Sequence, residues 1–116
     1  MVIQVNEDRN IIKDDDVYGT QNENNATNIE FTFPEKYQDF DKKIVFRGDD
    51  SSIVENIEND EYSIPNTVTS KRNVSFYVWL TNGDTAQDFR TKTYSINFFK
   101  NENATEQLPA ETPITA

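Results

Sequence analysis

The stretch Val74-Ser75-Phe76-Tyr77-Val78-Trp79-Leu80 decides the fold of this chain, because hydrophobic residues recur along it at every second position. A period of two is typical of a β-strand, whose successive side chains point to opposite faces of a sheet. We expect alternate residues from Val74 onward to face a core, and Tyr77 and Trp79 to face the other side. The segment Asn82-Gly83-Asp84 then predicts a turn, since Gly and Asn accept positive φ angles.

Shorter segments on both sides of this strand show related patterns. Ile29-Glu30-Phe31-Thr32-Phe33 places three hydrophobic residues on one face, and Pro34 ends it because proline cannot donate a hydrogen bond to a sheet. Residues 35–41 indicate a turn or a single helical turn. We predict further strands at residues 2–5, 43–46, 52–57, 61–64 and 89–99, the last with Tyr94, Ile96 and Phe98 on one side.

The two ends of the chain lack such patterns. Residues 6–28 are mostly polar and include the acidic run Asp14-Asp15-Asp16, so we expect a long connection there. Residues 101–116 carry two prolines and many small or polar residues, which is typical of a linker-like tail. The prediction is therefore one domain at residues 1–100, followed by a tail at residues 101–116.

The composition favours strands over helices. Ile and Val together number 18, whereas Leu, Ala and Met together number 8. β-branched side chains pack well on a pleated surface and lose rotamer freedom in a helix. About seven short strands separated by turns predict an all-β fold, an antiparallel two-layer sandwich that is loosely immunoglobulin-like. A partly open barrel is the alternative, because the sequence does not give the strand order.

Charge and missing residue types limit the classes of function. The chain has 116 residues and a formal net charge of −10, which repels nucleic-acid phosphates and anionic lipid headgroups. It contains no histidine and no cysteine, so triads and thiolate sites are impossible. We expect no enzyme activity, no catalytic residue and no cofactor. The first residues lack the basic start and apolar stretch of a signal peptide, so we expect synthesis in the cytoplasm.

Three acidic segments raise the question of a calcium site. They are Asp14-Asp15-Asp16, the pair Asp39 and Asp41, and Asp49-Asp50. Calcium prefers hard oxygen ligands, but none of these segments has the alternating acids, glycine and distal glutamate of a calcium loop. We favour solvated loops and predict no metal ligand.

Tyr77 and Trp79 are the candidate partner-binding residues. Large amphipathic side chains on the outer face of a strand are of the kind enriched at interfaces. The alternative, which we favour slightly, is that the long N-terminal segment folds over them within the same domain. The clustered cations Lys71-Arg72, Arg90 and Lys92 could pair with acids of a second copy. We favour a role for them in preventing unwanted pairing at strand edges.

Several segments resemble a known family when they are taken in order. They are Met-Val-Ile-Gln-Val-Asn at 1–6, Tyr18-Gly19-Thr20-Gln21-Asn22-Glu23-Asn24, Ile29-Glu30-Phe31-Thr32-Phe33-Pro34-Glu35-Lys36-Tyr37, Tyr62-Ser63-Ile64-Pro65-Asn66 and Phe89-Arg90-Thr91. This order is similar to the N-terminal β-sandwich domain of baseplate upper proteins and related tail structural proteins in phages of low-GC Gram-positive bacteria. The likeness covers most of residues 1–100 and includes no catalytic motif.

The resemblance implies a virion structural protein, a baseplate or tail component that mediates protein–protein assembly. Its partners would then be other virion proteins and copies of itself, with no nucleic acid and no membrane, and its location would be the virion. A C-terminal extension commonly follows in that family, whereas this sequence stops at Ala116. Two alternatives stay open: a capsid decoration protein, or a carbohydrate-binding sandwich in which Tyr77 and Trp79 stack on sugars of the host cell wall.

Overall fold

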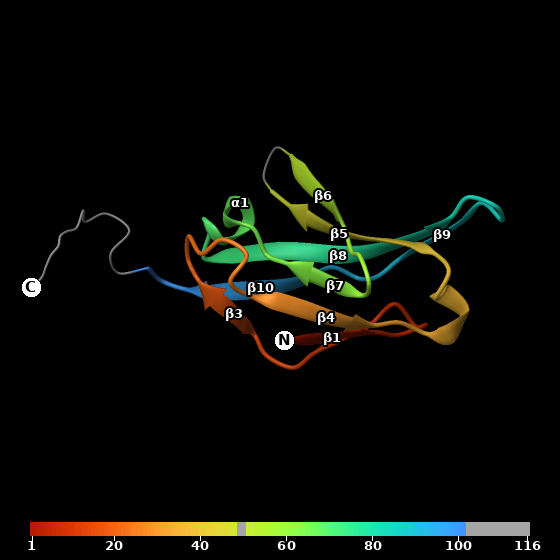
Figure 1. Cartoon of the computed structure of the whole chain (residues 1–116), viewed down its shortest axis with the longest axis horizontal. Helices are drawn as coiled ribbons and strands as arrows, with labels where there is room; N and C mark the ends of the chain where they lie inside the picture. Colours follow the sequence, from red (N-terminus) through yellow and green to blue (C-terminus); the bar gives the residue numbers. More distant parts are fainter. Residues whose placement is uncertain (49–50, 102–116) are drawn as a thin grey trace, which may run out of the picture.

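The computed structural model describes residues 1–48 and 51–101, which form an all-β sandwich of two sheets (Figure 1). The predicted all-β, two-layer class is therefore confirmed. The described residues contain ten strands, one 3-10 helix and one short α-helix. In chain order these are β1 (Val2–Val5), β2 (Ile11–Lys13), β3 (Val17–Thr20), β4 (Asn28–Thr32), η1 (Glu35–Tyr37), β5 (Asp41–Arg47), β6 (Ser52–Asn56), β7 (Glu61–Ser63), α1 (Asn66–Thr69), β8 (Asn73–Asn82), β9 (Gln87–Arg90) and β10 (Tyr94–Phe99).

The two sheets differ in size. The small sheet has the strand order β2-β1-β4-β7, and the large sheet has the order β3-β10-β8-β5-β6, with β9 also paired to β8. Most neighbours are antiparallel, as predicted, but β1 runs parallel to β4 and β3 runs parallel to β10. Both sheets are therefore mixed. Among the described residues, strand pairing joins strands only within each sheet, which supports a sandwich over a barrel.

Predicted and observed strands agree through the middle of the chain. The structure has β1, β4, β5, β6, β7 and β8 where the sequence predicts strands, and η1 where it predicts a helical turn. Helix α1 was not predicted; it begins at Asn66, directly after Pro65, which is the N-cap residue and has an extended backbone. No described helix is long and apolar enough to span a membrane.

The prediction of one long connection at residues 6–28 was wrong. This segment contains β2, which pairs with β1 at an edge of the small sheet, and β3, which pairs with β10 at an edge of the large sheet. Each strand is anchored by a single well-buried side chain, Ile11 in β2 and Tyr18 in β3. Strands of three or four residues with one such anchor have too short an alternation to stand out in a polar sequence.

The single strand predicted at residues 89–99 is two strands, β9 and β10, both on the same edge of β8. The break falls at Thr91, whose backbone N–H donates to the Val78 carbonyl at 3.0 Å. The Val78 N–H in turn donates to the Thr91 hydroxyl at 3.0 Å. Thr91 is buried, so its side chain replaces a ladder bond and lets the chain change register between the two strands. The predicted tail falls largely on residues 102–116, outside the described residues.

The core lies between the sheets and is built largely from aromatic and β-branched side chains. Ile3 and Ile29 from the small sheet and Phe76 and Ile96 from the large sheet are all 0% exposed. At one end, Tyr37 of η1 packs against Phe89 with ring centroids 4.6 Å apart. These contacts fix the inner face of each sheet, so the outer faces are the surfaces available for function.

Candidate interaction surface

Strand β8 is the backbone of the candidate surface. It runs through the large sheet, with β5 on one edge and β9 and β10 on the other (Figure 1). Phe76, Val78 and Leu80 are 0% exposed in the core, as their alternation predicts. Tyr77 and Trp79 alternate with them and are partly buried on the outer face. The predicted orientation of both candidate residues is therefore confirmed, while their role is still a prediction.

Strand register places a third hydrophobic residue on this outer face. Val45 of β5 lies directly opposite Tyr77 of β8 on one side and Val54 of β6 on the other. Val45 is only 2% exposed but does not belong to the core cluster that contains its neighbours Ile44 and Phe46. It is therefore buried by its neighbours on the outer face, whereas Val54 is 46% exposed.

Charged residues, most of them cations, flank this hydrophobic strip. Lys43 and Arg90 lie opposite Trp79 on its two neighbouring strands, β5 and β9. Arg47 alternates with Val45 along β5 and so projects to the same side. Asp41 alternates with Lys43 along β5, and Asp88 alternates with Arg90 along β9, so two carboxylates lie at one end of the same side. We call the whole set the outer aromatic face, which consists of Asp41, Lys43, Val45, Arg47, Val54, Tyr77, Trp79, Asp88 and Arg90.

Trp79 is held in place by two side chains of β9. Its indole Nε1–H donates to Asp88 Oδ1 at 2.7 Å, and the Arg90 guanidinium lies 4.7 Å from its ring centroid. Arg90 Nε also donates to Asp88 Oδ1 at 3.3 Å. The three groups therefore contact one another: the Asp88 carboxylate accepts hydrogen bonds from the indole and from the guanidinium, and the guanidinium covers the indole ring.

The electrostatics of this set favour the charged forms. Hydrogen bonds from Arg90 and then from Trp79 hold the pKa of the Asp88 carboxyl below its ordinary value. The bond to Asp88 raises the pKa of Arg90 in turn. Asp88 is therefore ionised at neutral pH and can accept both bonds, which limits the rotamers open to Trp79. A pre-positioned aromatic side chain loses less conformational entropy when it binds a partner.

The favoured prediction that the N-terminal segment folds over Tyr77 and Trp79 was wrong, because the segment takes a path that leaves this face open. Its strands β1 and β2 lie in the small sheet, and β3 lies beyond β10 at an edge of the large sheet. The segment reaches β9 through Arg9, whose Nη1 donates to the Arg90 carbonyl at 2.8 Å. Arg9 also lies over the ring of the core residue Phe89, 4.9 Å from its centroid. It therefore approaches β9 from the core side, and Trp79 and Tyr77 keep part of their surface exposed.

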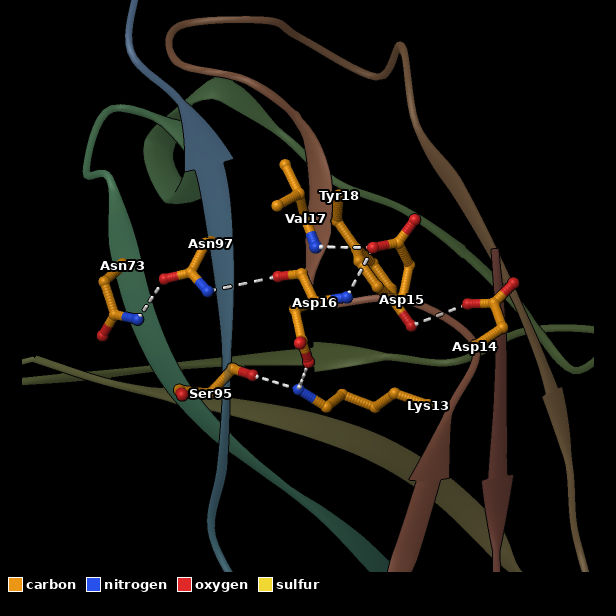
Figure 2. Close-up of polar contacts among 9 residues, drawn as sticks. All are labelled: Lys13, Asp14, Asp15, Asp16, Val17, Tyr18, Asn73, Ser95 and Asn97. Carbon is orange, nitrogen blue, oxygen red and sulfur yellow. Dashed lines mark hydrogen bonds and ion pairs between the residues drawn. The ribbon is translucent and has the colours of Figure 1, made fainter.

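The acidic run Asp14-Asp15-Asp16 has structural partners (Figure 2). Asp14 Oδ1 accepts from the Tyr18 hydroxyl at 3.2 Å, and Asp15 Oδ1 accepts from the next two backbone N–H groups. Asp16 Oδ1 accepts from Lys13 Nζ at 3.2 Å. The three carboxylates bind different donors instead of converging. Among the described residues, no group of three or more such ligands could hold a metal ion, and Asp49-Asp50 lies outside them.

The same loop ties the two sheets together (Figure 2). Lys13 of β2, in the small sheet, donates to the Ser95 carbonyl of β10, in the large sheet, at 2.7 Å. The Asp16 carbonyl accepts from Asn97, through the backbone N–H at 2.9 Å and the side-chain amide at 3.3 Å. Burial, and then the charge of Asp14, raises the pKa of Tyr18, so its hydroxyl stays protonated as a donor. The loop therefore has a structural role.

The predicted cation clusters separate in space. Arg90 lies on β9, which pairs only with β8, so it occupies a strand edge as the edge-protection hypothesis requires. Its side chain is nevertheless engaged with Asp88 and Trp79. Lys71 and Arg72 fall between α1 and β8, outside any strand. The sequence hypothesis therefore fits Arg90 by position, but it missed the contact with Trp79.

Two hollows of the described surface differ in the charge of their linings. One, of about 280 Å³, lies beside α1 and the β5–β6 hairpin and has Arg47 and Lys71 but no carboxylate in its lining. The other includes Glu7 and Asp8. Glu7 pairs with Lys36 at 3.0 Å, and hydrogen bonds from Asn10 lower the pKa of Asp8. A glycosidase acid needs a raised pKa, and the pKa of Asp8 is shifted in the opposite direction.

Comparison with known proteins adds no relative. No protein-family model matches the sequence, and no curated protein matches it with significant similarity. The case for function therefore depends on the geometry of the outer aromatic face and on the sequence resemblance stated above.

Proposed function

We propose that this domain is a phage virion structural component, of the baseplate or tail, that works by binding other proteins and not by catalysis. One observation carries the proposal: Trp79 and Tyr77 stand on the outer face of β8, and the indole is fixed there by Asp88 and Arg90. Trp, Tyr and Arg are the residues most enriched at the energetic centres of protein interfaces. The resemblance to baseplate upper proteins supplies the biological setting.

The geometry favours a protein partner over a sugar. Stacking on a carbohydrate needs an open aromatic ring face, but the Arg90 guanidinium already covers one face of Trp79. The residue opposite on the other side is Lys43, a second cation. A strip of aromatic and aliphatic side chains with charges around it resembles the anatomy of a protein interface, which has a hydrophobic centre and a polar rim.

The proposal is tested by asking where the protein is found. Virions purified from the phage or prophage that encodes the chain are analysed by mass spectrometry, and genes for tail or capsid proteins are sought beside its own. We expect the chain to copurify with particles at constant stoichiometry through a density gradient. Absence from purified particles would overturn the proposal. Binding to cell-wall glycan by a chain that stays monomeric would support the carbohydrate-binding alternative instead.

A further inference from the structure

The outer face of the small sheet carries the opposite charge to the outer aromatic face. Register aligns Val2 of β1, Glu30 of β4 and Glu61 of β7 in one row across the sheet. The next row contains Ile12 and Gln4. Val2 is 39% exposed and Ile12 is 55% exposed. This surface, which we call the acidic face, consists of Val2, Gln4, Ile12, Glu30, Thr32 and Glu61.

Two like charges face each other at the centre of the acidic face. Glu30 and Glu61 are directly opposite on antiparallel strands, and both are exposed. Like charges at such positions destabilise a sheet. None of the ion pairs among the described residues includes either carboxylate; Glu61 accepts one hydrogen bond, from the neutral Asn28 amide. The pair therefore lacks a neutralising cation within the described part of its own chain.

The outer aromatic face has cations that take part in no ion pair of the described chain. Arg90 is paired with Asp88, but the ion pairs of the described chain include neither Lys43 nor Arg47. Lys43 is partly buried beside Trp79, and Arg47 is exposed. Both lie on the same side of β5 as Val45, in a chain with a formal net charge of −10. The outer aromatic face thus has a small excess of cations, since Asp88 is paired with Arg90 and Asp41 lies at one end, whereas the charged residues of the acidic face are the carboxylates Glu30 and Glu61. Both faces have exposed hydrophobic surface.

We infer that the partner of the outer aromatic face is the acidic face of a second copy of this chain. This inference builds on the proposed function, since it names the partner and the surface that receives Tyr77 and Trp79. Lys43 and Arg47 of one copy would neutralise Glu30 and Glu61 of the next. Val2 and Ile12 would cover the hydrophobic strip. Complementary charge fixes which surfaces meet and in which register.

The pairing is head-to-tail. Two acidic faces would repel each other, because Glu30 and Glu61 of one copy would meet the same carboxylates of the other. Contact between two outer aromatic faces would leave the acidic pair of each copy without a cation. Contact between two different surfaces leaves one of each unused on every dimer, so the association continues into a ring or an open filament.

The interface is small. A sheet of four strands is about 19 Å wide, at roughly 4.8 Å between strands. Its longest strand, β4, has five residues and is about 17 Å long at roughly 3.4 Å per residue. The face therefore has an area of about 320 Å², below the roughly 800 Å² per partner of a standard stable interface. A single contact is weak, and ring closure strengthens it through high effective concentration. We therefore expect the associated fraction to increase with protein concentration, up to concentrations of about 1 mM.

A pair of charge reversals tests the inference. Glu30→Lys changes the acidic face, and Lys43→Glu changes the outer aromatic face. Each variant alone should lose association by at least about tenfold, because like charges then meet in every contact. A mixture of the two variants should recover it, since the two reversed faces then carry opposite charges and the two unchanged faces still fit each other. Sedimentation velocity measures all three samples.

Matched controls place the same charge changes elsewhere. Asp84→Lys in the β8–β9 turn and Lys100→Glu after β10 alter exposed residues outside both faces, and they should leave association unchanged. Circular dichroism and melting temperature show that each variant is folded. A wild-type chain that stays monomeric, variants that associate normally, or a mixture that fails to recover would each overturn the inference. None of these results would remove the chain from purified virions, so the proposed function is judged separately.

Discussion

The outer faces of the two sheets differ in charge and in how their side chains are held. On the large sheet, Trp79 is fixed by Asp88 and Arg90, and Lys43 and Arg47 flank the hydrophobic strip. On the small sheet, Glu30 faces Glu61 with no ion pair to a cation of the described chain. The net charge of the whole chain therefore does not describe how charge is distributed between the two faces. A total of −10 hides a surface on which cations gather around aromatic side chains.

We expect the largest loss of stability from a substitution on the inner side of β8. A substitution on the outer side of the same strand provides the comparison. Phe76 is 0% exposed, so Phe76→Ala should lower the free energy of unfolding by about 3–5 kcal/mol. Tyr77 is partly buried, and Tyr77→Ala should cost only about 1 kcal/mol. Urea unfolding followed by circular dichroism measures both. Equal losses would show that the two sides of β8 do not differ as described.

Trp79→Ala should separate binding from folding. We expect association of the chain to weaken at least about tenfold, because truncation of an aromatic at an interface centre costs about 2 kcal/mol or more. Sedimentation velocity measures this loss, and circular dichroism should show a folded monomer. Ile12→Ala, which changes an exposed hydrophobic residue on the acidic face, should weaken association less. Unchanged association in Trp79→Ala would remove this residue from the interface.

The sequence predicted the orientation of strand β8 but not all the residues of the candidate surface. The alternation along 74–80 was enough to orient Tyr77 and Trp79, because one strand's period is a local property. The role of Val45 was hidden in the continuous apolar run Ile44-Val45-Phe46, which does not show which residue turns outward. Only the register with β6 and β8 places it on the outer face.

A local sequence pattern does not predict which strands are in contact. The parallel pairs β1–β4 and β3–β10 join segments far apart in the chain. The contacts of Trp79 with Asp88 and Arg90 require β9 to pair with β8 in one particular register. The Asn82-Gly83-Asp84 turn signal pointed to that hairpin, and the alternation of Asp88 and Arg90 after it was the available clue.

Glu30→Lys tests the repulsion between Glu30 and Glu61 on the acidic face. It places a lysine opposite Glu61 and converts a repulsive cross-strand pair into an attractive one. We expect the monomer to gain about 0.2–1 kcal/mol of stability, visible as a higher melting temperature in dilute solution. Asp84→Lys, with the same change of charge in a turn, serves as control. A fall in melting temperature for Glu30→Lys would contradict the repulsion.

The smallest effect is a local response to pH. The pKa of Asp88 is held below its ordinary value, so the contribution of its bonds is complete above the unfolded pKa of about 3.9 and is lost as pH falls through the lower folded pKa. Trp79 is the only tryptophan, and its fluorescence should change in that acidic range while circular dichroism stays native. Asp88→Asn should remove the transition. A transition that persists in this variant would assign it to another group.

The most direct test of assembly through the outer aromatic face is carbodiimide cross-linking of mixed chains, half of them labelled with ¹⁵N. This reagent joins a lysine to a carboxylate in contact, and the Lys42–Asp60 pair at 3.3 Å provides a control within one chain. We predict products that join Lys43 of one copy to Glu30 or Glu61 of another, identified by their mixed isotope masses. Cross-links between copies that avoid Lys43, or links within single chains only, would contradict the account.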